Sequence, residues 1–137
     1  MKKRHYIYPD VDSLIAAFIC EVERFLDEVE ELERPAHLAL SGGGTPLAIF
    51  ERLAEVTDKK DWKEVRIYWV DERMVPPDDV QSNFGNAWKT LIAPLDLARE
   101  QVQRIRGEED PEKEARRYGQ LLKDKLPVQN GFPVFDW

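Results

Sequence analysis

The chain has 137 residues, a length that suits one domain or part of one. Hydrophobic residues make up 42% of it and charged residues 34%, a balance that excludes a disordered or fibrous protein. The net charge of -7 excludes the basic surface of a nucleic-acid binder or of a polybasic membrane anchor. No apolar run approaches the ~20 residues that span a bilayer. We therefore expect a cytoplasmic protein that binds neither nucleic acid nor membrane. The single cysteine, Cys20, suits a reducing compartment and is expected to be a small buried residue on a helix.

The amino-terminal half alternates short apolar runs with amphipathic segments. His5–Tyr8 is predicted to be a strand, and apolar residues spaced by three and four predict a helix over Asp12–Glu33. His37–Ser41 is predicted to be a buried strand that leads through three glycines into a helix over Pro46–Val56. We expect Thr45 to be the N-cap of that helix, with the following proline as its first residue.

The carboxyl-terminal half continues the alternation of strands and helices. A proline-rich stretch over Val75–Asp79 contains too many turn residues to be regular. The predicted elements around it are a strand over Val65–Val70, a helix over Ser82–Ile92, a strand over Val102–Arg106, a helix over Pro111–Lys125 and the start of a strand over Phe132–Trp137.

This order of elements indicates a single α/β domain over residues 1–137. Strands that alternate with helices form βαβ units, so we expect a Rossmann-like, mostly parallel sheet with helices on both faces. Ligands of such sheets bind beyond the carboxyl ends of the strands. Because Gly42–Thr45 and Asp71–Arg73 each follow a predicted strand, both loops are expected at one edge of the sheet.

The turn formed by Gly42, Gly43, Gly44 and Thr45 has the features of an anion site. Residues without a Cβ let the backbone approach a ligand, and the helix N-terminus adds partial positive charge. The lysine of a nucleoside-triphosphate loop is missing, and Leu47 occupies the third glycine position of the dinucleotide fingerprint. Spacing alone leaves two interpretations open, a phosphate site and a tight turn without a ligand.

The second loop combines a carboxylate pair, Asp71 and Glu72, with a guanidinium, Arg73. Arginine offers a planar fork that suits phosphate, although an Asp–Arg pair that only fixes the loop is an open alternative. Arg106, at the end of a predicted strand, is a further candidate phosphate ligand. Asp71 can orient a water molecule, but an exposed carboxylate is a weak base at neutral pH. His5 and His37 lie away from the predicted edge and lack metal-ligand spacing, so both are expected to be structural or exposed.

Three motifs in this order resemble the 6-phosphogluconolactonase family: SGGGTP at Ser41–Pro46, WVDERMVP at Trp69–Pro76 and SNF at Ser82–Phe84. Ile105–Glu108 and Phe132–Asp136 are weaker matches, so the similarity covers nearly the whole chain. The related glucosamine-6-phosphate deaminases typically have a tyrosine where Arg73 stands. The sequence is therefore more similar to the lactonases.

The resemblance implies hydrolysis of 6-phospho-D-glucono-1,5-lactone to 6-phospho-D-gluconate in the oxidative pentose phosphate pathway, without a metal or other cofactor. It implies catalytic roles for Asp71 and Arg73. The residues expected to bind the phosphosugar are Gly42, Gly43, Gly44, Thr45, Arg73, Ser82, Asn83 and Arg106.

The resemblance also implies that the chain is an incomplete domain. Family members continue into a loop whose histidine is regarded as the catalytic base, whereas this sequence ends at Trp137. We therefore expect the amino-terminal part of a longer lactonase domain, nearly inactive alone because general-base catalysis typically contributes roughly 10²–10⁴-fold. An incomplete parallel sheet has an unpaired edge, which favours self-association.

Two other functions remain open. A non-catalytic sugar-phosphate binding module would keep the glycine turn and lack the chemistry, and it would bind 6-phosphogluconate without turning over the lactone. An isomerase related to glucosamine-6-phosphate deaminase would open the ring of glucosamine 6-phosphate or release ammonia from it. Arg73 disfavours this last function.

Overall fold

The computed structural model describes residues 5–137 and is built around a small parallel sheet. Strand β1 (Ala36–Leu40) pairs along its whole length with β2 (Val65–Trp69), from Ala36 opposite Val65 to Leu40 opposite Trp69. On its other side, β2 pairs with the short β3 (Val102–Gln103), which gives the order β1-β2-β3. All three strands run parallel, as the sequence predicts.

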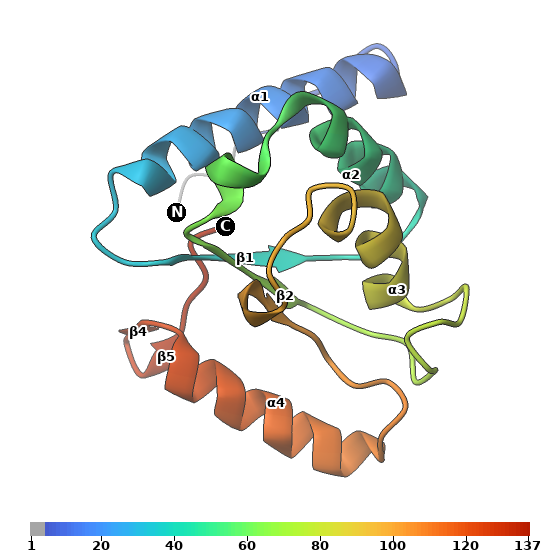
Figure 1. Ribbon diagram of the computed structural model, residues 1–137, viewed down its shortest axis with the longest axis vertical. Coiled ribbons are helices and arrows are strands. Elements are labelled where there is room, and N and C mark those ends of the chain that lie inside the picture. The colour runs from blue at the N-terminus through green and yellow to red at the C-terminus, as the bar shows by residue number, and fades with distance from the viewer. Residues whose placement is uncertain (1–4) are drawn as a thin grey trace.

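Helices cover both faces of this sheet (Figure 1). Helix α1 (Val11–Glu30) and helix α2 (Gly44–Val56) lie on one face, and α4 (Pro111–Lys125) lies on the other. The α1 helix begins where the Asp10 carboxylate accepts a hydrogen bond from the Ser13 amide at 2.7 Å. The predicted Rossmann-like α/β class, with helices on both faces of a parallel sheet, is confirmed.

The N-cap predicted for α2 is wrong by two residues. Gly43, not Thr45, is the N-cap, and the helix begins at Gly44. Gly43 has a φ of 110°, a conformation that a side chain disfavours, so the chain turns at this glycine before the threonine is reached.

The segment predicted as one helix over Ser82–Ile92 changes its winding. It begins as α3 (Asn83–Ala87), capped by Ser82, and continues as the π-helical turn η2 (Trp88–Ile92). The Ala93 amide donates to the carbonyl of Trp88, five residues earlier. Pro94 follows and has no amide hydrogen, so the α-helical ladder cannot continue through it. Two 3₁₀ turns, η1 (Lys59–Trp62) and η3 (Arg99–Gln101), precede β2 and β3.

Three predicted strands need correction. His5–Tyr8 has no regular structure. The apolar side chain of Ile7 is 94% exposed, so no neighbouring strand packs beside this segment and pairs with it. The strand expected over Val102–Arg106 is paired only over its first two residues. The stretch from Phe132 forms a hairpin instead, in which β4 (Val128–Gln129) runs antiparallel to β5 (Phe132–Pro133). Its two turn residues both have positive φ, as two-residue hairpins favour.

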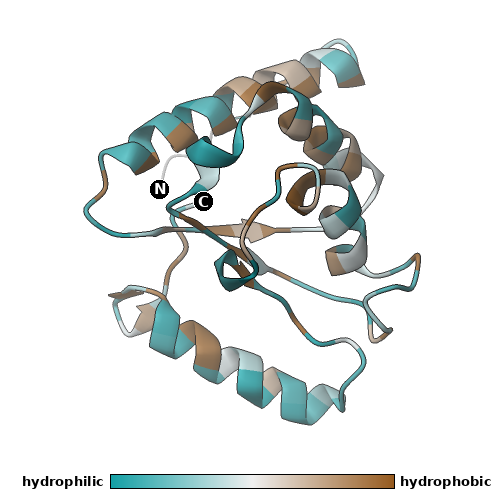
Figure 2. Ribbon diagram, viewed as in Figure 1, coloured by the Kyte–Doolittle hydropathy of each residue, from teal (hydrophilic) through white to brown (hydrophobic). Residues whose placement is uncertain are grey.

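Side chains of β2 alternate between two hydrophobic clusters. Ile67 and Trp69 belong to the larger cluster, which lies between the sheet and helices α1 and α2. Tyr68 belongs to the smaller cluster beneath α4, together with Tyr118. In Figure 2, β1 is mostly brown and α4 mostly teal, in keeping with a sheet buried between layers. Cys20 is exposed on α1, so the expectation of a buried cysteine is wrong.

Tyr118 ties α4 to the sheet where β2 and β3 separate. Its hydroxyl accepts a hydrogen bond from the Trp69 amide at 2.9 Å and lies 3.1 Å from the carbonyl oxygen of Gln103. Burial raises the pKa of Tyr118 to about 12. The phenol is therefore neutral near pH 7 and bridges two strands that have diverged.

The last residues of the chain lie along the free edge of β1. The Asp136 amide donates to the His37 carbonyl at 2.9 Å, and the Ala39 amide donates to the Trp137 carbonyl at 3.0 Å. Arg34 holds the Asp136 carboxylate through two hydrogen bonds of 2.6 and 2.9 Å. Among residues 5–137, no helix has the length and apolar character needed to cross a membrane.

Candidate functional site

The loops that follow β1 and β2 are joined through Asn83, the first residue of α3 (Asn83–Ala87), at the carboxyl edge of the sheet. A Cβ added to Gly42 would lie 1.8 Å from Oδ1 of Asn83, so the glycine is required for this close approach. The side-chain amide of Asn83 donates to the Asp71 carbonyl at 3.2 Å. The glycine turn, the start of α3 and the loop after β2 are therefore joined, and the expectation that the two loops share one edge is confirmed.

Glu72, which the sequence places beside Asp71 as one of a carboxylate pair without a predicted site role, organises this edge. One carboxylate oxygen accepts the amides of Arg73 and Asn83, both at 2.7 Å. The other accepts the Phe84 amide at 2.9 Å and the Ser82 hydroxyl at 3.2 Å. A carboxylate about ten residues before a serine N-cap is a weak sequence signal for such a contact, because the N-terminus of a helix favours negative charge nearby.

Ser82 and Asn83 are engaged within the protein. Ser82 is 1% exposed, and its hydroxyl oxygen accepts the Gly85 amide at 2.9 Å as the cap of α3. Asn83 is 6% exposed and bonds to the loop after β2. Their side chains therefore position the two loops.

Asp71 and Arg73 are both exposed at this edge. They form no ion pair with each other within residues 5–137, so the alternative of a fixed Asp–Arg pair does not describe this loop. The backbone of Arg73 is nevertheless held firmly. A Cβ on Gly107 would lie 2.2 Å from the Arg73 carbonyl oxygen, so the loop after β3 packs directly against it.

The glycine turn presents an open helix N-terminus. Gly43, Gly44 and Thr45 are exposed, and the N-cap residue of the 13-residue α2 supplies no side-chain acceptor to the first turn. Amides at such a position favour an anion, because they point outward and carry the positive end of the helix dipole. An anionic ligand at this turn stays a prediction.

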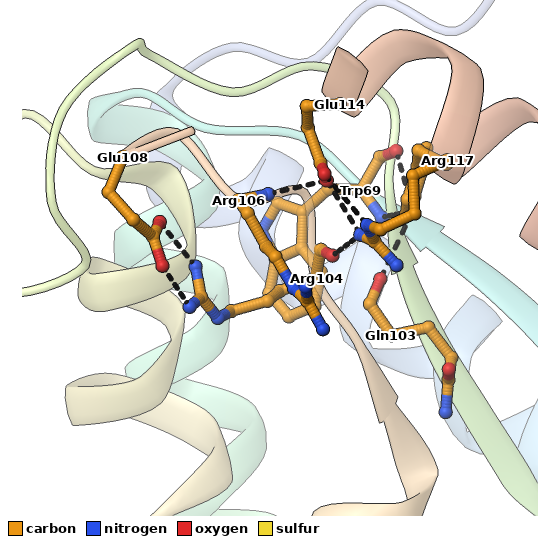
Figure 3. A network of polar contacts seen from close by, with 8 residues as sticks. Trp69, Gln103, Arg104, Arg106, Glu108, Glu114 and Arg117 are labelled. Atoms are coloured by element: carbon orange, nitrogen blue, oxygen red, sulfur yellow. Dashed lines mark hydrogen bonds and ion pairs between the residues drawn. The ribbon is translucent and has the colours of Figure 1, made fainter. Parts of the chain in front are cut away.

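Arg106 lies in a neighbouring environment. Its backbone amide donates to the Glu114 carboxylate at 2.8 Å (Figure 3). Arg106 lines a separate cavity of about 590 Å³. None of the other predicted site residues lines this cavity. The structure therefore joins the glycine turn to Asp71–Arg73 and Ser82–Asn83, and it places the Arg106 side chain beside them in a different recess.

His37 is buried in the amino-terminal half of β1, away from this edge. Its Nδ1 lies 3.1 Å from the hydroxyl of Tyr68. Burial lowers the pKa of His37, although the nearby Asp136 carboxylate opposes that effect. His5 is exposed and belongs to no regular element. Both observations agree with the expectation that neither histidine serves the site.

Comparison with known proteins places this arrangement in a family. A family model described as glucosamine-6-phosphate isomerases/6-phosphogluconolactonase matches residues 9–137. A 6-phosphogluconolactonase of Treponema pallidum is 42% identical over 137 residues, which cover 99% of this chain and 54% of that protein.

Two solved structures share the fold. The crystal structure of devB protein is 36% identical with a TM-score of 0.84, covering 98% of this chain and 56% of that one. A 6-phosphogluconolactonase from Trypanosoma brucei is 25% identical with a TM-score of 0.84, covering 96% and 56%. The chain spans about half the length of the relatives it matches. It belongs to the glucosamine-6-phosphate isomerase/6-phosphogluconolactonase family.

Proposed function

We propose that this chain is the amino-terminal, substrate-binding part of a cytoplasmic 6-phosphogluconolactonase domain. The proposed substrate is 6-phospho-D-glucono-1,5-lactone, and the product is 6-phospho-D-gluconate. The observation that carries the proposal is the contact of Gly42 with Asn83 and of Asn83 with the Asp71 backbone. These contacts hold an open helix N-terminus and an exposed arginine at the same edge of the sheet. Relatives that bear the lactonase name support the choice of substrate.

The proposed phosphate site combines backbone amides with one guanidinium. The first-turn amides of α2, from Gly44 and Thr45, face outward without a side-chain cap. Arg73 supplies a charge-assisted donor from the adjoining loop. Arg106 lines the neighbouring cavity and is not part of this proposed site. Ser82 and Asn83 act in this proposal by positioning the loops, since their side chains are bonded internally.

The proposed chemistry is attack of water on the lactone carbonyl. Water adds to the carbonyl carbon to give a tetrahedral intermediate, and its collapse breaks the ring C–O bond. One proton of the water passes to the ring oxygen, which becomes the sugar hydroxyl, and the other is released when the carboxylic acid ionises. Asp71 orients the water in this proposal. Its exposed carboxylate is a weak base at neutral pH, and a missing general base costs roughly 10²–10⁴-fold. We therefore expect slow turnover by this chain alone.

The test measures binding and turnover separately. Calorimetry with 6-phosphogluconate should give saturable binding, and Arg73→Ala should weaken it about tenfold because one charged hydrogen bond is lost. Arg52→Ala is the matched control, because Arg52 lies on the exposed face of α2 and, among residues 5–137, its side chain pairs only with Glu55. Equal binding by the Arg73→Ala variant and the unchanged chain would contradict the proposed site.

A non-catalytic binding module is the second candidate function. The observation that favours it is the position of His37, whose imidazole lies in the other half of β1, away from the proposed phosphate site. The rate of lactone hydrolysis is measured from the protons released, after subtraction of the spontaneous rate. Turnover that Arg73→Ala abolishes supports the enzyme, whereas binding with no turnover supports the module.

A further inference from the structure

A basic cleft lies between the α3–η2 segment and α4. Its cavity of about 590 Å³ falls within the usual size of small-molecule sites, roughly 300–1,000 Å³. Five cationic side chains line it: Lys89, Arg99, Arg104, Arg106 and Arg117. Asp78 is the one acidic residue among the residues that line it. In a chain with a net charge of -7, a quarter of the 20 lysines and arginines thus face one cavity.

Two of these arginines are held rigidly in place (Figure 3). Glu108 accepts two hydrogen bonds from Arg104, at 2.9 and 2.5 Å, and the Arg104 guanidinium lies 5.3 Å from the centre of the Phe84 ring. Glu114, which is 3% exposed, accepts two bonds from Arg117 at 2.7 and 2.6 Å. A guanidinium has five donor hydrogens, so each arginine keeps unused donors after these contacts. The pairs orient the arginines without exhausting them.

The other three cations are available to a ligand. Within residues 5–137, the side chains of Lys89, Arg99 and Arg106 form no hydrogen bond or ion pair. Oriented and unengaged cations around one cavity are the arrangement that recognises a multiply charged phosphate group. Arg104 and Arg117 are each balanced by a carboxylate, so the positive charge that a ligand would meet comes from these three cations, partly offset by Asp78.

The cleft also offers an aromatic surface. Trp88 lines it and is 38% exposed, with its ring 5.9 Å from that of Phe84. An exposed indole beside a phosphate-binding cluster suits a ligand that carries a flat ring. We propose that the basic cleft binds a nucleoside polyphosphate, with its phosphates among the arginines and its base on Trp88. This site is separate from the proposed lactone site.

The test is calorimetry on the full chain with ATP, tripolyphosphate and adenosine as probes. ATP should bind saturably, and Arg99→Ala and Arg106→Ala should each weaken it about tenfold. These two side chains make no internal bonds, so neither change is expected to disturb the fold. Trp88→Leu should weaken ATP while leaving tripolyphosphate binding unchanged. Arg52→Ala and Arg73→Ala should leave ATP binding unchanged.

Several results would overturn the proposal. One is the absence of binding by both ATP and tripolyphosphate, and another is ATP binding that Arg99→Ala and Arg106→Ala do not weaken. If Trp88→Leu leaves ATP binding unchanged, the assignment of the base to Trp88 is wrong. Displacement of ATP by 6-phosphogluconate would show that the cleft is a sugar-phosphate site. Loss of 6-phosphogluconate binding in Arg73→Ala alone bears on the lactone site and leaves this proposal standing.

Discussion

Glu72 shows how a residue next to a site can matter more for its assembly than for its chemistry. Its two carboxylate oxygens accept three backbone amides and one hydroxyl, all from its own loop or the start of α3. Both oxygens are thus engaged within the protein. The exposed neighbours Asp71 and Arg73 face solvent on a loop that Glu72 holds.

Glu72→Gln should lower the free energy of unfolding by about 1–3 kcal/mol, because the amide nitrogen cannot accept the bonds that one carboxylate oxygen accepts. Chemical denaturation measures this change, and calorimetry should show weaker 6-phosphogluconate binding in the same variant. Glu51→Gln, on the exposed face of α2, is the control and should change stability by less than about 0.5 kcal/mol. Equal effects of the two changes would show that the carboxylate at position 72 is dispensable.

His37 makes stability depend on pH. Burial lowers its pKa in the folded chain, so the unfolded chain binds more protons as the pH falls below about 6.5. Acidification through that range therefore favours unfolding. We expect the melting temperature to fall between pH 7.5 and pH 5.5, and the fall to be smaller in His37→Gln. A fall of the same size in both proteins would assign the effect to other groups.

At the scale of elements, glycines set how closely the loops approach one another. Gly42 meets Asn83, Gly85 meets the Pro77 carbonyl, and Gly107 meets the Arg73 carbonyl. A Cβ at any of the three would lie within 2.2 Å of its neighbour. The loops after β1, β2 and β3 are therefore packed into one unit.

Gly107→Ala should destabilise the chain by roughly 1–3 kcal/mol, because the added methyl group meets backbone that cannot rotate away. Gly119 offers a control of opposite sign. It lies within α4 with nothing inside 4 Å of an added Cβ, so Gly119→Ala should stabilise the chain by about 0.5–1 kcal/mol. Thermal denaturation compares the two variants, and a loss of stability in both would contradict the explanation.

The elements that the sequence predicted well are those with a strong local pattern. The α1 stripe and the apolar runs of β1 and β2 are visible in the order of residues, and the carboxyl-end rule places both loops on one edge. The strand expected at His5–Tyr8 failed because strands need a partner, which no local pattern reveals. The sequence shows Glu72 beside Asp71 but not its role in joining the loop to α3, because these bonds reach residues ten to twelve positions away.

At the scale of the whole molecule, the sheet has one edge that is only partly covered. Residues 136–137 bond to β1, and beside them lies an apolar groove of about 460 Å³. The Trp137 ring contacts Phe18 and Phe25 at the rim of this surface, at centroid distances of 5.1 and 5.6 Å. An apolar surface next to a partly paired strand favours association.

We expect self-association through this groove, with a second copy of the chain as the partner. Light scattering coupled to size exclusion should show an apparent mass that rises with protein concentration. Phe18→Glu should suppress the rise, because it places a charge in the groove. Leu32→Glu, at another exposed apolar position, should not. A monomer at every concentration would contradict this prediction.

The interlocked glycines restrict how this scaffold is able to diversify. Lengthening or shortening any one of the three loops would pull a glycine away from the atom it touches and disturb both neighbours. We therefore expect specificity to change by substitution of outward-facing side chains, such as those of Thr45 and Arg73, while the lengths of the loops stay constant.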